Sequence, residues 1–262
     1  ENIAVGRLAM YYNQSGEDNV AVGYAALYEN TTADNNTAVG FKSLFSNTTG
    51  TANVAVGAFA LDANTTASNN TALGYLSLTA NTTGAQNTAV GRSALAAITT
   101  GSHNTAVGYA ALDAEDTGGA SVAVGPWALS SQNYDGNAYN TAVGYLAGED
   151  VTTGVKNTLI GGLAGDAITT GERNVYLGYT TGTSATDVSF NVGLGAESLY
   201  TNVNGSRNVA VGNGALFAMN PASDTDTYNV AVGYDAGVAV TTGVQNTIVG
   251  GLAGDAITTG SS

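Results

Sequence analysis

A short repeat determines what this 262-residue chain can fold into. The letters A-V-G, or close variants, recur with an asparagine or serine four residues before the glycine, which we call the repeat glycine. Successive repeat glycines follow a 17-residue period, except for spacings of 19 before Gly144 and 21 before Gly233. A fixed short period is typical of solenoids, in which each repeat forms one coil that stacks on the next. The fifteen repeat glycines are Gly6, Gly23, Gly40, Gly57, Gly74, Gly91, Gly108, Gly125, Gly144, Gly161, Gly178, Gly195, Gly212, Gly233 and Gly250.

The aligned coils predict strands and an interior. Three residues before the repeat glycine stands Ile, Val or Thr in every coil, and the residue directly before it is always Val, Leu or Ile. This alternation predicts a short strand in each coil, such as residues 20–22, with the aliphatic column buried. Four residues after the repeat glycine comes Leu in nine coils, Met in one and Gly in five. We expect a second inward column there, with close packing at its glycines, which are Gly148, Gly165, Gly182, Gly237 and Gly254.

Polar residues mark the turns of the repeat. Many coils turn through T-T-G, as at residues 99–101 and 169–171, and we expect that glycine to need a positive φ. The asparagine that opens fourteen of the fifteen coils predicts a ladder of amides bonded to neighbouring turns. The sequence N-T-T is a formal glycosylation acceptor, but we interpret its four copies as turn residues. They begin at Asn30, Asn47, Asn64 and Asn81.

Composition excludes several classes of function. Hydrophobic residues make up 44% of the chain, enough to fold, while the net charge of -14 disfavours nucleic acids and anionic membranes as partners. The chain contains no cysteine and no apolar run long enough to span a membrane. The single histidine, His103, cannot form a multi-histidine metal site and is expected on the surface. Glu149 and Asp166 share a column in adjacent coils and could hold a cation, although an exposed acidic edge is the simpler interpretation. We therefore expect no enzyme, no cofactor and no metal.

The small core of one coil favours assembly. One Val and one Leu per coil do not offset the conformational entropy of ordering the whole repeat, so a lone coil cannot form. Stacking adds ladder hydrogen bonds, and several chains around one axis would add the missing burial. We predict a homotrimer, intertwined or side by side, that can also join end to end.

Two stretches carry a resemblance to known fibres. The sequence N-V-A-V-G at Asn53–Gly57 resembles the head repeats of trimeric autotransporter adhesins, and Asn104–Leu112 is similar to the N-T-A-V-G-Y-x-A-L repeats of phage tail fibres. The resemblance covers the whole chain and implies a left-handed parallel β-roll trimer used for surface attachment, outside the cell or on a virion. The expected fold is thus an all-β, parallel β-solenoid of fifteen 17-residue coils, one domain over residues 1–262 and a stretch of a longer fibre.

Two insertions, at about 130–139 and 217–228, leave the regular repeat. Loops that decorate a solenoid often bind, so Trp127, Tyr134, Tyr139 and Tyr228 are candidate contacts for a cell-surface glycan or receptor. The alternative is that these aromatics pack against neighbouring coils. A different function, ice binding, is suggested by Thr pairs stacked from Thr31–Thr32 to Thr99–Thr100, although adjacent Thr side chains point in opposite directions in an extended strand. The predicted function is a structural or attachment fibre, with an ice- or glycan-binding module as the alternative.

Overall fold

The computed structural model describes residues 1–261, which form strands and turns without a helix. The chain divides into two compact units. Unit 1 comprises residues 1–127 and 133–137, and unit 2 comprises residues 128–132 and those from 138 onwards. The division runs through the first insertion of the sequence.

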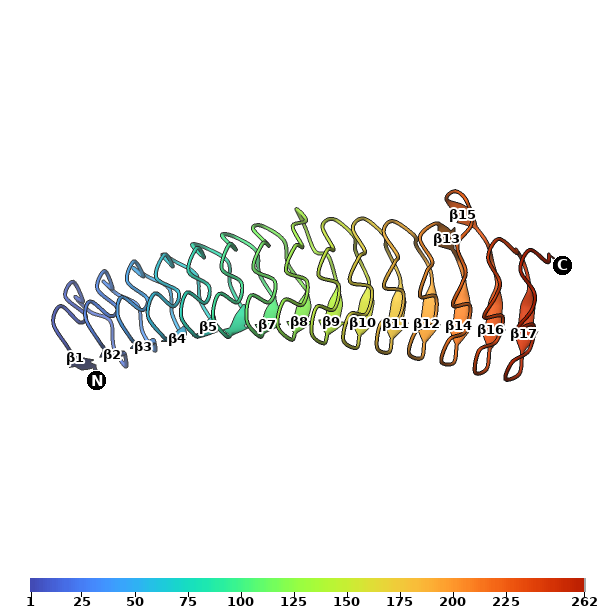
Figure 1. The fold of residues 1–262 in the computed structure, drawn as a ribbon. Coiled ribbons are helices and arrows are strands. Elements are labelled where there is room, and N and C mark those ends of the chain that lie inside the picture. Colours follow the sequence, from blue (N-terminus) through green and yellow to red (C-terminus); the bar gives the residue numbers. More distant parts are fainter. Residues whose placement is uncertain (262) are drawn as a thin grey trace. The chain divides into compact units, whose positions relative to one another are not determined.

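Unit 1 is a parallel β-solenoid of eight coils (Figure 1). Each strand pairs with the next one in strict register, so that residue i lies opposite residue i+17, as Ala38 lies opposite Ala55. The strands are β1 (Ile3–Val5), β2 (Val20–Val22), β3 (Thr37–Val39), β4 (Val54–Val56), β5 (Thr71–Leu73), β6 (Thr88–Val90), β7 (Thr105–Val107) and β8 (Val122–Val124).

Unit 2 continues the same repeat with seven further coils. Its main strands are β9 (Thr141–Val143), β10 (Thr158–Ile160), β11 (Val175–Leu177), β12 (Val192–Leu194), β14 (Val209–Val211), β16 (Val230–Val232) and β17 (Thr247–Val249). The second insertion leaves the coil between β14 and β16, and its two-residue strand β15 (Thr225–Asp226) pairs in parallel with β13 (Gly205–Ser206) of the preceding turn. The predicted all-β solenoid with one strand in each coil is confirmed.

The core of each coil is built from alanine and leucine. The middle residue of the strand, such as Ala106, and the leucine four after the repeat glycine, such as Leu112, are wholly buried. The residues on either side of that alanine, Thr or an aliphatic residue before it and an aliphatic residue after it, point to the opposite face of the sheet and stay partly exposed, as Val107 does. The predicted burial of the aliphatic column is therefore wrong for this chain. The inner side of the strand faces the leucine column and has room only for a small side chain.

Exceptions to the alanine rule show how tight the interior is. Tyr176 replaces the middle alanine of β11 and is fully buried. Around it the leucine column is reduced to glycine: a Cβ added at Gly182 would lie 2.4 Å from the Tyr176 ring, and one at Gly165 would lie 3.1 Å from it. Leu159 similarly faces Gly148, where a Cβ would lie 2.6 Å from Leu159 Cδ1. The predicted close packing at the glycines of this column is confirmed, and its cause is a larger residue in the facing column.

Buried asparagines connect the coils. In the column that opens each strand, the side-chain oxygen accepts from the backbone N–H of the next coil, as Asn36 N donates to Asn19 Oδ1 over 2.9 Å. Each side-chain amide also donates to a turn carbonyl, as Asn36 Nδ2 does to Gly50 O. The predicted amide ladder is confirmed. Such bonds satisfy polar backbone groups that would otherwise be buried without partners.

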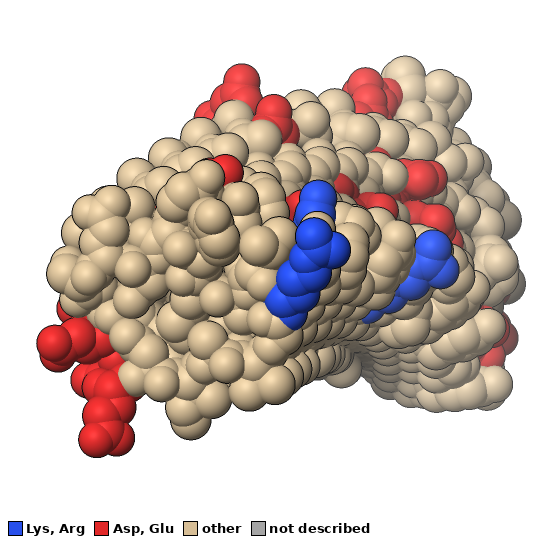
Figure 2. All heavy atoms as spheres, turned by 90° about the vertical axis from the view of Figure 1, so that its left-hand side faces the viewer, with Lys and Arg blue, Asp and Glu red and all other residues tan. Residues whose placement is uncertain are grey.

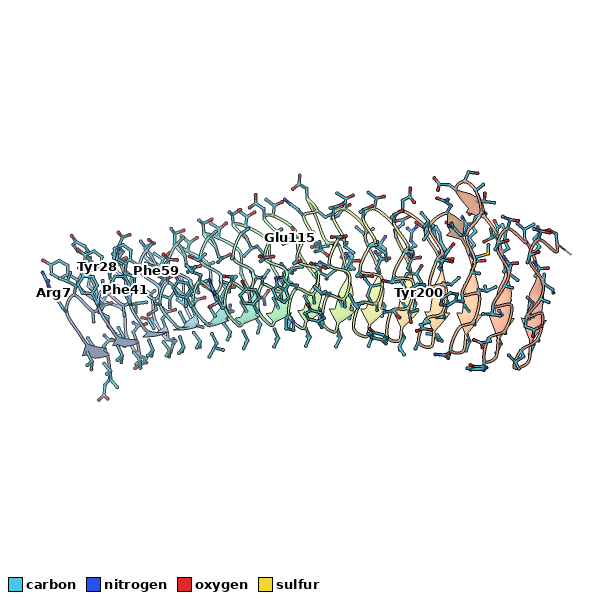
Figure 3. The ribbon with its side chains drawn as sticks, viewed as in Figure 1. Arg7, Tyr28, Phe41, Phe59, Glu115 and Tyr200 are labelled. Atoms are coloured by element: carbon cyan, nitrogen blue, oxygen red, sulfur yellow. The ribbon has the colours of Figure 1, made fainter. Side chains whose placement is uncertain are left out.

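A second amide ladder lies in the turn of unit 1. Each member donates to the one before it, as Asn64 Nδ2 does to Asn47 Oδ1 over 2.7 Å. The members are Asn13, Asn30, Asn47, Asn64 and Asn81. Four of them open the N-T-T sequences and are fully buried, so a glycan on these amides is incompatible with the fold. The ladder ends where Ile98 takes the next place, and one coil later the buried Glu115 accepts from Gly118 N over 2.9 Å (Figure 3).

Positive φ angles occur at other places than the turn glycine. The repeat glycines have φ near the value of +140° found at Gly23, whereas Gly101 and Gly171 of the T-T-G turns are outside the positive-φ region. The predicted positive φ is therefore wrong for these two turn glycines. Gly101 is required by proximity instead, since a Cβ there would lie 2.0 Å from Gly118 O of the next coil. Non-glycine residues such as Leu27 and Asn35 adopt the left-handed conformation in the turns.

Candidate binding surfaces

The outward side of the strands forms the first candidate surface. We call it the outer sheet face, made by the first and third residues of each main strand. No charged residue occurs in either column. Away from the end strands β1 and β17, the exposed fraction is 37% at Leu73 in unit 1 and 47% at Leu177 in unit 2. Each unit thus presents a regular, uncharged array of β-branched and aliphatic side chains. Such an exposed apolar array marks an interaction surface more often than a free one.

Aromatic side chains line the turn that follows the strands of unit 1. Because the turns of successive coils lie side by side, their rings meet: Tyr24 and Phe41, one residue after the repeat glycine, stack with centroids 5.3 Å apart, and Phe59, one residue further on in its coil, lies edge-on 5.2 Å from Phe41. The guanidinium of Arg92 continues the series between Tyr75 and Tyr109. We call this series the aromatic stripe, and its members are Tyr24, Phe41, Phe59, Tyr75, Arg92, Tyr109 and Trp127.

Shorter aromatic stacks occur elsewhere. Tyr28 stacks on Phe45 at 5.0 Å, and in unit 2 Tyr200 stacks on Phe217 at 4.9 Å (Figure 3). Ring pairs of this kind stabilise neighbouring coils by about 0.5–1.5 kcal/mol each. They explain aromatic side chains as contacts between coils without any ligand.

A different column of unit 2 combines cations with aromatic rings. It lies five residues before the repeat glycine, where the chain enters the next strand, and all its side chains are exposed. Phe190 lies between two guanidinium groups, with its ring centroid 5.2 Å from Arg173 Cζ and 4.5 Å from Arg207 Cζ. Arg207 Cζ is also 5.8 Å from the ring of Tyr228. We call this column the basic–aromatic ladder: Tyr139, Lys156, Arg173, Phe190, Arg207 and Tyr228.

The structure places the four aromatic residues predicted as glycan contacts in three different surroundings. Trp127 packs edge-on against Tyr109 at 5.0 Å and belongs to the aromatic stripe. Tyr134 lies in the part of the first insertion that belongs to unit 1 and is partly buried. Tyr139 and Tyr228, exposed by 56% and 50%, are the two ends of the basic–aromatic ladder. The four therefore do not form one cluster. The cations between the two ladder tyrosines were missed, although all of them share one column of the aligned repeat.

The insertions themselves stay close to the coils. In the first one, Asp135 accepts from Thr117 Oγ1 over 2.6 Å and Gly119 N donates to Gly136 O. In the second one, Arg207 forms an ion pair of 2.9 Å with Asp226. Both loops are thus tied to the preceding coil by hydrogen bonds or an ion pair.

No pocket opens on the surface of residues 1–261, and among them no group of three or more His, Cys, Asp or Glu side chains is placed to hold a metal. Among the same residues no helix is long and apolar enough to cross a membrane. His103 is exposed in a turn.

Several carboxyl groups are held in unusual surroundings. Partial burial raises the pKa of Asp62, Asp113 and Asp166. Burial, followed by the charges of Asp150 and Asp166, raises the pKa of Glu149 as well. Asp166 accepts a hydrogen bond from Thr183. Burial also raises the pKa of the Tyr176 hydroxyl, whose oxygen has no hydrogen-bond partner among residues 1–261.

The stacked Thr pairs of unit 1 are largely used within the solenoid. The first Thr of each pair donates its hydroxyl to the next coil: to a carbonyl in four pairs, as Thr31 Oγ1 does to Thr48 O over 3.1 Å, and to the Asp116 carboxylate at Thr99. Only the second Thr of each pair, such as Thr32, is exposed. Ice recognition by two adjacent Thr columns is therefore disfavoured, because one column faces its neighbours.

Charge is sparse on the surface around these features. Figure 2 shows that most of the visible surface carries neither charge, and that acidic side chains lie both beside the few basic ones and apart from them. Comparisons with protein-family models, with curated proteins and with solved structures find no match to this chain.

Proposed function

We propose that the chain is a structural and attachment segment of an extracellular fibre, on a cell surface or a virion, in which three copies pack through their outer sheet faces. The observation that carries the proposal is the outer sheet face itself. It repeats in each main strand, is free of charged residues and leaves aliphatic side chains such as Leu73 partly exposed. The stacked coils of each unit supply a regular support for this face.

Packing of copies on this face is favoured by its composition. A lone chain leaves two aliphatic or β-branched side chains per coil in contact with water, and burying apolar surface contributes about 25 cal/mol per Å². The face is also uniform along each unit, so identical chains can associate in register without like charges meeting. The same regularity suits end-to-end polymerisation of the segment.

A matched pair of substitutions in β7 tests this proposal. Val107→Asp places a charge on the outer sheet face, whereas Ala106→Asp places it in the core. In the proposed assembly Val107→Asp lowers the native mass from three chains to one, since a buried unpaired charge costs several kcal/mol, and it changes the stability of the dissociated chain by only about 0.5 kcal/mol. Ala106→Asp abolishes folding. A wild-type chain that is monomeric by native mass measurement contradicts the assembly.

Ice binding by the same face is the second candidate function. Its first column is Thr or Val and its second is Val or Leu across β2–β8, so hydroxyl and methyl groups repeat at the coil spacing. This regular array favours the outer sheet face over the Thr pairs of the turns. Thermal hysteresis at micromolar concentration, lost in Val107→Asp, would support this function over the fibre.

A further inference from the structure

Basic residues are concentrated in one column of unit 2. The whole chain contains 6 Lys and Arg against 20 Asp and Glu, yet Lys156, Arg173 and Arg207 all belong to the basic–aromatic ladder. The other members of the ladder are aromatic. A chain of net charge -14 thus carries a local run of positive charge, flanked by Tyr139 and Tyr228. This is the chemistry of a site for an anion that also has apolar faces.

Aromatic rings hold the guanidinium groups in place. Phe190 is sandwiched between Arg173 and Arg207, and Tyr228 lies on the other side of Arg207. An arginine stacked on a ring keeps its N–H edge available while its side chain loses conformational freedom. Binding then costs less entropy, because the donors are already ordered before a ligand arrives.

The neighbouring acidic side chains do not block the ladder. Arg173 pairs with Glu172 over 2.8 Å and Arg207 with Asp226 over 2.9 Å, and all four side chains are at least 36% exposed. Exposed ion pairs are worth about 0–1 kcal/mol, so a ligand anion can compete for the same arginines. Lys156 forms no ion pair with any residue of the described range 1–261.

We propose that the basic–aromatic ladder binds an extended anionic polysaccharide. Lys156, Arg173 and Arg207 contact its carboxylate or sulfate groups, while Tyr139 and Tyr228 pack beside its sugar rings. The coils advance by about 4.8 Å each, similar to the advance of one sugar along an extended glycan, so successive rungs of the ladder meet successive sugars. The proposal names the ligand class for the attachment part of the proposed function and does not depend on the number of chains. Nucleic acid is disfavoured, since its dense phosphates would meet only three cations in a strongly acidic chain.

Two double variants of equal net charge test the ladder. The probes are alginate, a polymer of uronic acids, and heparin, a sulfated polymer, with neutral dextran as a control. The wild type is expected to bind alginate or heparin more weakly as salt rises and not to bind dextran. Arg173→Gln with Arg207→Gln lowers the affinity at least about tenfold, as expected for lost charge-assisted hydrogen bonds. Lys42→Gln with Arg92→Gln, in unit 1, leaves the affinity within about twofold at the same net charge.

Three results would contradict polysaccharide binding by the ladder. They are a wild type that binds neither polymer, a unit 1 variant that loses as much affinity as the ladder variant, and single-stranded DNA that binds as tightly as the polysaccharide. Binding of alginate alone assigns carboxylates as the recognised group, and binding of heparin alone assigns sulfates. Native mass measured on the same samples reports assembly separately. If the protein is a monomer and still binds polysaccharide through the ladder, the proposed trimer is contradicted and the proposed binding site is supported.

Discussion

At the scale of single residues, a large side chain in one column of the core faces a small residue in the opposite column. Tyr176 occupies a position that is alanine in most coils. Gly182, Gly165 and Gly193 leave room for its ring because they have no side chain. A Cβ at Gly193 would lie 3.1 Å from the Tyr176 ring. Close-packed interiors respond to single methyl groups, so these positions depend on one another and their substitutions will not be additive.

A double-mutant cycle tests this complementarity of size. Gly182→Ala alone is expected to destabilise the chain by about 1–3 kcal/mol through overpacking against the Tyr176 ring. Tyr176→Ala alone leaves a cavity that costs about 3–5 kcal/mol. In the Tyr176→Ala background the methyl at Gly182 fills part of that cavity, so its cost shrinks or changes sign. Denaturant unfolding of the four variants measures the coupling.

The control for this cycle separates crowding from backbone strain. Gly214 has a φ of +65°, close to the +60° of Gly182, but its added Cβ would meet only the flexible end of Asp235. Gly214→Ala is therefore expected to cost about 1 kcal/mol in either background. If Gly182→Ala costs the same with and without Tyr176, the complementarity of size between the columns is disproved.

At the scale of the coil, the second insertion is an addition to a closed turn. Met219 and Tyr228 occupy the places that Val240 and Gln245 hold in the next coil, where only four residues separate them. The β13–β15 pair and the Arg207–Asp226 ion pair hold the extra residues against the coil, and the buried Thr227 at their end donates its hydroxyl to Asn208 Oδ1 over 2.7 Å. Long surface insertions add little loop-closure entropy, so the regular coil can take their place.

Replacing residues 220–227 with Thr-Thr-Gly-Val, the sequence that follows Val240, should preserve the fold. We expect β14 and β16 to remain paired and the thermal midpoint to change by no more than a few degrees, because the alanine, leucine and asparagine columns keep their residues and the loss is confined to contacts of the insertion such as the hydrogen bond from the buried Thr227 to Asn208. Circular dichroism during heating measures this. The four-residue replacement Thr-Thr-Leu-Val, which lacks the glycine, is the control and should destabilise the coil, since the glycine in this turn approaches the next coil closely: a Cβ at Gly243 would lie 2.5 Å from Gly260 O. Equal midpoints for the two replacements would contradict that reason.

Most features of the coil could be predicted from the sequence, but the inward face of its strand could not. The period, the parallel stacking, the leucine column and the asparagine ladder all follow from the aligned repeat, because each depends on one position that recurs from coil to coil. The inward face of the strand does not follow, because Ala106 and Val107 are both apolar and alternation alone cannot decide between them. The deciding factor is the width of the coil, which admits alanine opposite Leu112.

The candidate site was predicted in part. Tyr139 and Tyr228 were selected as aromatic residues of the insertions, and both occupy the ladder. The cation–ring contacts between them could not be predicted, because they depend on side-chain directions in left-handed turn residues such as Arg207, with a φ of 63°. Trp127 and Tyr109 are packed against each other, which supports a contact between coils at that position.

At the scale of the whole molecule, acidic charge opposes the compact state. The net charge of -14 produces repulsion within the folded chain. The carboxyl groups with raised pKa also lower folding stability at neutral pH, because their charged forms are less favourable in the folded chain. Asp62, Asp113, Asp166 and Glu149 bind protons more strongly in the folded chain than in the unfolded chain. Folding stability therefore falls as pH rises through the range above the usual pKa of 3.8 for Asp and 4.5 for Glu, and is regained on acidification.

The thermal midpoint should accordingly be higher at about pH 5 than at pH 7. Protonation of partly buried carboxyl groups and the lower net charge act in the same direction, so the two effects add. Asp166→Asn, whose amide oxygen can still accept from Thr183, should raise the midpoint at pH 7 and flatten its dependence on pH. Glu17→Gln is the matched control, because that side chain is exposed, and it should change only the part due to net charge. Melting curves between pH 4 and pH 8 decide the matter, and a midpoint that falls steadily from pH 7 to pH 5 would show that acidic repulsion does not limit the stability of this solenoid.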